Sequence, residues 1–386
     1  MANSPSSMQG FYDGVTNVSD FIWGGTWHGE QVLLFPPMVV ILLGVGIWIM
    51  IGLRFYPITH LGQAFAEGSL AIRYREKGPD GHFRGGPMNY IRNGLGKKWG
   101  WLAVIFCIGL LFSSIATGNM IQANSFADSF SGLTGIPEWG SGIIVAVAVF
   151  AVIIGGIKSI GAIAEKIVPI MALVYLLMAF LALAMNYSAI PGAFLTIIDS
   201  AFTGHAAAGG FLGAGMILAI RSGVARGLFS NEAGQGSTPI AHAVAQTDDP
   251  ARQGRFAMMG TFIDTIIICT ATGLVMLAVQ GAFPHTGADG AVVMQNTVWT
   301  SDLRGFAMTE AAYATAFPFL VFGNVTIGGL VASIALILFV FTTLITWGYY
   351  GERAATYLFG MKLAIPFRLF WVVMIFIGSF QEIELV

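Results

Sequence analysis

Long apolar runs dominate this sequence, and most polar residues fall between them. A helix that crosses a lipid bilayer needs about 20 mostly apolar residues. Seven runs fit or approach that pattern, and a shorter eighth run lies close to the end of the chain. The predicted membrane segments are 32–53, 101–122, 141–157, 167–185, 209–220, 256–279, 328–349 and 367–380. The pattern therefore predicts an all-α polytopic membrane protein with about 8 membrane segments.

Two further stretches are predicted to be helical without crossing the bilayer. Residues 305–324 are moderately apolar but contain Glu310 and Pro318, which suits a helix lying over the outer mouth. Residues 61–75 read as an amphipathic cytoplasmic helix, too short and too charged to cross. No linker or low-complexity tract divides the sequence, so residues 1–386 are expected to form a single membrane transport domain. Residues 1–31 would be an outer N-terminal segment and residues 32–386 the helix bundle.

Composition supports the membrane interpretation. Of the 386 residues, 56% are hydrophobic and 10% are charged, against roughly 45–50% and about 25% in ordinary soluble domains. A soluble globular protein is thereby excluded, and a net charge of -2 gives no reason to expect nucleic-acid binding. All but one of the 18 lysines and arginines fall in alternate loops, the exception being Arg304. Because basic residues accumulate in cytoplasmic loops, the N-terminus is predicted to lie outside.

A stripe of polar residues enters the otherwise apolar segment 101–122. Asn119 and Gln122 are three residues apart and share one helix face. Amide side chains bind both the carboxylate and the ammonium group of an amino acid, so this stripe is a candidate ligand wall. The alternative is that the two amides only form hydrogen bonds between helices.

The segment 209–220 is short and glycine-rich. Clustered glycines weaken a helix and leave its backbone accessible, and a broken membrane helix is tolerated where its freed backbone groups face protein or a water-filled cavity. The run 204–215 is therefore a candidate ligand site. Close helix packing explains the run equally well, since Gly209 and Gly213 have the GxxxG spacing.

Two further membrane segments contain polar groups. Asp264 lies near the predicted mid-bilayer depth of its segment, which suggests ion or proton coupling; a structural carboxylate bonded to neighbouring threonines is the alternative. Thr342, Thr343 and Thr346 place three hydroxyls along one apolar helix, a pattern suited to a hard cation such as sodium. Threonines that bond back to their own helix would explain the same pattern.

Enzyme motifs are not found in the sequence. It contains no HExxH, GxSxG or complete GxGxxG motif, and its 6 histidines are scattered without ligand spacing. Cys107 and Cys269 both lie within apolar runs and read as small core residues. Neither an enzyme nor an organic cofactor is therefore expected.

Three stretches together resemble the sodium:alanine/glycine symporter family: 227–241 (GLFSNEAGQGSTPIA), 85–91 (GGPMNYI) and 118–125 (GNMIQANS). The first of these is the most specific signal. The resemblance implies a secondary transporter of the inner membrane that carries small neutral amino acids, alanine or glycine, together with sodium. It also implies a leucine-transporter-like inverted-repeat helix bundle, a fold in which broken helices bind substrate near the midplane.

The resemblance assigns roles to particular residues. Asn119 and Gln122 would face the substrate, while Thr342 and Thr343 would contribute hydroxyls to a sodium site. The glycine-rich segment would correspond to the broken sixth core helix of that fold. Its implied contributors are Gly209 and Gly210, through their backbone, and Phe211, as a lid.

One departure from the family pattern is expected to matter. Family members carry two more membrane segments between the end of the first segment and the piece resembling residues 66–75, and one of these holds much of the substrate and sodium site. The tenth core helix is also not matched, so the bundle is expected to be incomplete and cut short near residue 386. The alternative function is therefore a non-transporting membrane protein or an assembly partner derived from this family.

Overall fold

The computed structural model describes two compact parts of the chain. Unit 1 comprises Met1–Tyr90 and Thr196–Ile266, and unit 2 comprises Ile91–Leu195 and Ile267–Val386. The described residues are 26–27, 30–31, 60–78, 81–202, 230–286, 292–298, 303, 306–322 and 325–381. The predicted segments 32–53 and 209–220 lie outside them.

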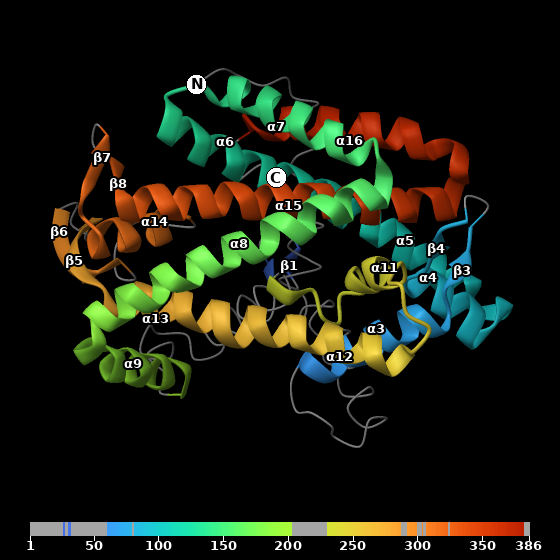
Figure 1. The fold of residues 1–386 in the computed structure, drawn as a ribbon, viewed down its shortest axis with the longest axis horizontal. Helices are drawn as coiled ribbons and strands as arrows, with labels where there is room; N and C mark the ends of the chain where they lie inside the picture. Colours follow the sequence, from blue (N-terminus) through green and yellow to red (C-terminus); the bar gives the residue numbers. More distant parts are fainter. Residues whose placement is uncertain are drawn as a thin grey trace. The chain divides into compact units, whose positions relative to one another are not determined.

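Unit 1 is built around two helices that lie side by side, α3 (His60–Arg73) and α12 (Pro250–Thr261) (Figure 1). Gly68 and Gly254 allow this close approach, because a Cβ atom on Gly68 would lie 2.9 Å from the Ala257 Cβ. The short helix α11 also packs against α3. The remaining elements of this unit are β1 (Thr26–Trp27), β2 (Glu30–Gln31), β3 (Glu76–Lys77), β4 (Phe83–Arg84), α4 (Pro87–Tyr90) and α11 (Thr238–His242).

Unit 2 is a helix bundle centred on α15 (Ile327–Phe359), which packs against α5, α6, α8, α14 and α16 (Figure 1). Its other helices are α5 (Gly100–Ile115), α6 (Ile121–Thr134), α7 (Glu138–Ile153), α8 (Gly156–Met185), α13 (Thr270–Ala278), α14 (Phe306–Ala316) and α16 (Ala364–Gly378). Two antiparallel hairpins, β5 (Gln280–Thr286) with β6 (Val292–Thr297) and β7 (Leu320–Phe322) with β8 (Val325–Thr326), flank α14 in the sequence. Helix α9 (Ile190–Phe202) begins in this unit.

Local sequence signals fix several helix ends. Asp249 caps α12, since its carboxylate accepts from the backbone N–H groups of Ala251 (2.9 Å) and Arg252 (3.2 Å), with Pro250 at the first helical position. The Thr326 hydroxyl accepts from the Gly329 N–H (3.1 Å) and caps α15. Such caps satisfy backbone groups that a helix end leaves unpaired.

Among the described residues, five helical stretches are long and apolar enough to cross a membrane: Lys97–Thr134, Gly156–Met185, Pro250–Ala278, Ile327–Phe359 and Met361–Gly378. The third of these continues α12 through a π-helical run, η5 (Phe262–Cys269), into α13. Large apolar side chains such as Phe112 (72% exposed) and Leu173 (69% exposed) project from this bundle. Water is a poor environment for so much apolar surface, whereas lipid covers it at no cost. The described part of the chain is accordingly that of an all-α polytopic membrane protein with small hairpins.

Each of the six predicted membrane segments within the described residues overlaps a helix, but most of the boundaries differ. The segment 141–157 ends at Ile153, and α8 then begins at Gly156, whose φ of +68° makes the turn. The outer stretch 305–324 is helical only over Phe306–Ala316 and continues into β7. The amphipathic helix expected at 61–75 is α3.

Candidate functional site

Asn119 lies in a π-helical turn, η3 (Ala116–Met120), between α5 and α6 of unit 2. Its side chain is fully buried, and its Nδ2 donates to the Trp371 carbonyl oxygen of α16 (2.9 Å). Its Oδ1 is also buried and has no hydrogen-bond partner among the described residues. A buried amide oxygen without a partner is costly. One end of this amide thus forms a hydrogen bond between helices.

Gln122 lies in α6 on the same helical run. Its Nε2 donates to the Thr117 carbonyl oxygen (3.3 Å), a backbone group of the adjoining turn. The two amides of the predicted ligand wall therefore have different partners: Asn119 bonds a neighbouring helix, and Gln122 bonds its own.

Thr342 and Thr343 lie in the middle of α15 and bond back to their own helix. The Thr342 hydroxyl donates toward the carbonyl oxygens of Leu338 (3.0 Å) and Phe339 (2.9 Å), and the Thr343 hydroxyl donates to Phe339 (2.9 Å). A hydroxyl that donates its proton retains oxygen lone pairs. These side chains can therefore both support the helix and present oxygen to a cation.

The threonines and the Asn119 turn belong to one neighbourhood of unit 2. The buried Trp347, four residues after Thr343, packs against Gly118, where a Cβ atom would lie 2.6 Å from the indole ring. Four residues of α-helix rise about 6 Å. The turn that contains Asn119 thus contacts α15 about one helical turn beyond Thr343.

Asp264 belongs to unit 1 and lies in the π-helical run η5. Its carboxylate accepts from the Ser230 hydroxyl (2.6 Å), and the adjacent Thr265 hydroxyl accepts from the Asn231 amide (2.7 Å). Asp264 is therefore bound to the beginning of the glycine-rich stretch 227–241. Gly209, Gly210 and Phe211 lie outside the described residues.

Residues of the glycine-rich stretch bind the carboxylate of Glu67 on α3. This residue was not predicted from the sequence. One carboxylate oxygen accepts from the N–H groups of Gly234 (3.2 Å) and Gly236 (3.1 Å), and the other bonds the Thr238 hydroxyl (3.2 Å). Burial raises the pKa of Glu67 to about 7, although these hydrogen bonds act to lower it. The glycines of the motif are the sequence signal for this site, because Gly234 and Gly236 both adopt positive φ.

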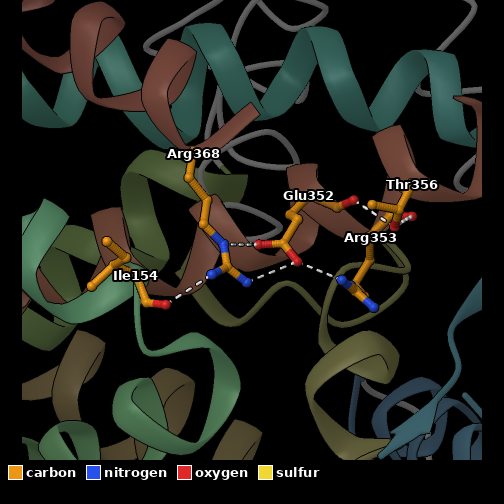
Figure 2. A network of polar contacts seen from close by, with 5 residues as sticks. All are labelled: Ile154, Glu352, Arg353, Thr356 and Arg368. Carbon is orange, nitrogen blue, oxygen red and sulfur yellow. Dashed lines mark hydrogen bonds and ion pairs between the residues drawn. The ribbon is translucent and has the colours of Figure 1, made fainter. Parts of the chain in front are cut away.

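A second buried cluster joins three elements of unit 2 (Figure 2). Glu352 of α15 accepts from Arg368 Nε of α16 (2.6 Å) and also pairs with Arg353. Arg368 Nη1 donates to the carbonyl oxygen of Ile154, at the turn between α7 and α8 (2.9 Å). Thr356 bonds back to the Glu352 carbonyl oxygen (2.8 Å). One carboxylate thus connects α15, α16 and the α7–α8 turn.

Acid is expected to destabilise unit 1 through His242. Its Nδ1 accepts from the Gln253 amide (2.6 Å), and burial lowers its pKa to about 4. The folded state therefore favours the neutral ring, so this contribution to stability is complete above about pH 6.5 and is lost as the pH falls toward 4, up to about 3 kcal/mol. His242→Gln keeps an acceptor for Gln253 and removes this loss. Thermal unfolding in detergent between pH 4 and 7.5 measures it, with His82→Gln as a control; equal acid sensitivity in the His242→Gln variant and the parent would contradict the assignment.

The described helices, which carry amide, carboxylate and hydroxyl groups on apolar segments, are those of a multi-pass membrane protein. The sodium:alanine symporter family profile matches residues 61–386. The chain therefore belongs to the sodium:alanine symporter family, and it is a member of a family of transporters and not an enzyme.

Relatives of the chain are transporters as well. An uncharacterized transporter of Haemophilus influenzae is 39% identical over 333 residues, covering 85% of this chain and 68% of the relative. The sodium/alanine symporter AgcS of Methanococcus maripaludis is 40% identical over 332 residues, covering 84% of this chain and 67% of the relative. The probable sodium/glutamine symporter GlnT of Bacillus subtilis is 34% identical over 332 residues, covering 85% and 63%. The chain thus spans about two thirds of the length of these relatives.

Proposed function

We propose that this protein carries a small neutral amino acid, with alanine as the first candidate and glycine as the second, across the cell's inner membrane together with sodium. The observation that carries the proposal is the family match over residues 61–386. The name of the 40% identical relative supports alanine. The probable glutamine symporter among the relatives shows that substrate assignments differ within this group.

The proposed substrate contacts are Asn119 and Gln122, completed by Gly209, Gly210 and Phe211. The Oδ1 of Asn119, which has no partner among the described residues, supports this assignment, because it is a buried acceptor that an ammonium group would satisfy. We assign the sodium contacts to the Thr342 and Thr343 hydroxyl oxygens, and ion coupling to Asp264. Binding from outside, closure under Phe211 and release to the cytoplasm would follow an alternating-access cycle.

The sodium assignment is tested by removing one hydroxyl at a time. Thr342→Val and Thr343→Val preserve side-chain shape and are expected to raise the sodium concentration needed for half-maximal alanine binding by about tenfold, which corresponds to about 1.4 kcal/mol. The measurement is binding of radiolabelled alanine to purified protein in detergent at increasing sodium concentration.

Thr346→Val is the matched control. Its hydroxyl makes the same kind of bond, to the Thr342 carbonyl oxygen (2.8 Å), but it is not assigned to the sodium site. Equal effects of all three substitutions would indicate a loss of helix support, and unchanged sodium dependence in Thr342→Val and Thr343→Val would remove both residues from the site.

A further inference from the structure

Three donors from one short stretch of the family motif converge on the Glu67 carboxylate. The side chain lies in the middle of α3 and is 6% exposed. One carboxylate oxygen accepts from the Gly234 and Gly236 N–H groups (3.2 and 3.1 Å). The other accepts from the Thr238 hydroxyl (3.2 Å). Because each of these bonds joins the same buried carboxylate, Glu67 fixes the backbone of this stretch on α3.

We call residues 230–238 the motif loop, and its backbone is shaped for this contact. Glu232, Gly234 and Gly236 have φ values of 57°, 88° and 83°, a left-handed pattern that turns successive N–H groups toward one acceptor. The loop also closes on itself, because the Ser237 hydroxyl donates to the Glu232 carboxylate (2.5 Å). The motif loop is therefore a folded unit, and a change at one of its contacts is passed to the others.

The beginning of the motif loop contacts Asp264 and Thr265 of η5. The Ser230 hydroxyl donates to the Asp264 carboxylate (2.6 Å). Asn231 bonds in two directions: its Nδ2 donates to the Thr265 hydroxyl (2.7 Å), and its Oδ1 accepts from the Ala233 N–H (2.8 Å). Asn231 thus joins η5 to the part of the loop that is bonded to α3.

These bonds form a continuous path from Glu67 to Asp264 within unit 1. We propose that Glu67 is a positioning residue for Asp264. Its carboxylate holds the motif loop, and the loop in turn directs the Ser230 hydroxyl at the Asp264 carboxylate. Ser230 makes the contact, and Glu67 acts through it. The effect on ion coupling rests on the proposed function, which assigns coupling to Asp264, whereas the attachment of the loop to α3 does not.

Arg75 offers the comparison with a purely structural anchor in the same unit. Its side chain is 6% exposed, and its guanidinium group donates to the carbonyl oxygens of Ala243 (3.2 Å), Ala245 (2.7 Å) and Thr247 (2.8 Å). This stretch follows the motif loop, and none of these bonds reaches Asp264. Arg75→Met is therefore expected to lower the stability of unit 1 without changing the sodium dependence of alanine binding.

Binding of radiolabelled alanine to the purified full chain, at increasing sodium concentration, tests the positioning role. Ser230→Ala removes a hydrogen bond to a charged group and is expected to raise the sodium concentration for half-maximal binding about tenfold. Glu67→Met keeps the side-chain length but has only a weak sulfur acceptor, and it should raise that concentration about threefold. The double variant should need no more sodium than Ser230→Ala alone, because Glu67 acts through Ser230. Glu67→Gln keeps an oxygen acceptor for the glycine N–H groups and should bind like the parent.

Several outcomes of this binding experiment would overturn the proposal. One is an unchanged sodium dependence in Glu67→Met, and another is an additive effect of Glu67→Met and Ser230→Ala. A shift of equal size in Arg75→Met would show that any loss of stability in unit 1 has this effect. In each of these cases the parent still binds alanine with sodium, so the proposed function stands. A parent without sodium-dependent alanine binding would contradict the proposed function, and the positioning role would fail with it.

Hydrogen–deuterium exchange measures the attachment of the motif loop without any substrate. Glu67→Met is expected to lower the protection of the Gly234 and Gly236 amides about tenfold, while Glu67→Gln and Arg75→Met keep the protection of the parent. Where Glu67→Met does not fold, Thr238→Val removes only the hydroxyl bond to the carboxylate. It should lower loop protection and raise the sodium requirement, each about twofold. Unchanged loop protection in the folded variants would overturn the attachment, whether or not the parent binds alanine.

Discussion

Replacing Glu352 with glutamine is expected to lower the stability of unit 2 by about 3–5 kcal/mol, the usual cost of removing one partner from a buried ion pair. Glu352 is the carboxylate shared by Arg353 and Arg368, and its side chain is 5% exposed. Without its charge, two guanidinium groups would remain in a poorly hydrated place with only neutral acceptors, the glutamine side chain and the Ile154 carbonyl oxygen. Arg353 Nε already lacks a hydrogen-bond partner among the described residues, so the cluster has few acceptors for its guanidinium groups.

Thermal unfolding of the detergent-solubilised protein, followed by tryptophan fluorescence, measures this loss. The exposed Glu165→Gln on α8 is the matched control and should leave the unfolding temperature within the error of the parent. The double variant Glu352→Gln/Arg368→Gln should lose less than the sum of the single variants, because each removes the same interaction. A Glu352→Gln protein as stable as the control would show that the cluster does not hold α15, α16 and the α7–α8 turn together.

Substituting Gly118 with alanine is expected to destabilise unit 2 by about 1–3 kcal/mol, the range for overpacking a core. The new methyl group would lie 2.6 Å from the Trp347 ring, which is itself only 4% exposed. Since Trp347 is one turn from Thr343, its displacement should also weaken sodium-dependent alanine binding.

Gly109→Ala is the control for this change. Gly109 lies on α5 of the same helical run, and nothing lies within 4 Å of a Cβ atom placed there. Alanine has the higher helix propensity, so Gly109→Ala should be neutral or stabilising. Equal unfolding temperatures for the two variants would mean that the Gly118–Trp347 contact does not constrain the bundle.

The positions of the helices could be predicted from the sequence because membrane helices have a simple pattern. Segment 328–349, for example, falls within α15, and an unbroken apolar run leaves few other structures. The family could also be identified from the sequence, because the stretches 227–241 and 118–125 are each specific motifs of consecutive residues. Helix ends were less predictable: residues 156–166 continue α8 although they contain Lys158, Glu165 and Lys166.

The polar contacts could be predicted only in part. The alternative in which threonines bond back to their own helix is a local one, and the structure shows such bonds for Thr342, Thr343 and Thr346. The hydrogen bond from Asn119 to α16 and the bonds between Glu67 and residues 234–238 join residues far apart in sequence. The hydrophobic pattern of a sequence does not show which distant residues pair. The motif 227–241 therefore identified the family but did not show that its partner is Glu67.

The substrate and sodium roles, the single-domain expectation and the expected loss of two core segments remain predictions. The predicted segment 209–220, which lies outside the described residues, contains Gly209, Gly210 and Phe211, which the family resemblance assigns to the site. Among the described residues, Asn119 is proposed to bind the substrate, and Thr342 and Thr343 are proposed to bind sodium.

Uptake of radiolabelled alanine into liposomes that contain the purified chain tests the central claim most directly. The comparison is between an inward sodium gradient, equal sodium on both sides, and empty liposomes. A sodium-coupled symporter will accumulate alanine above its outside concentration only with the gradient. No gradient-dependent accumulation by folded, monodisperse protein would contradict the account and would favour a non-transporting member of the family.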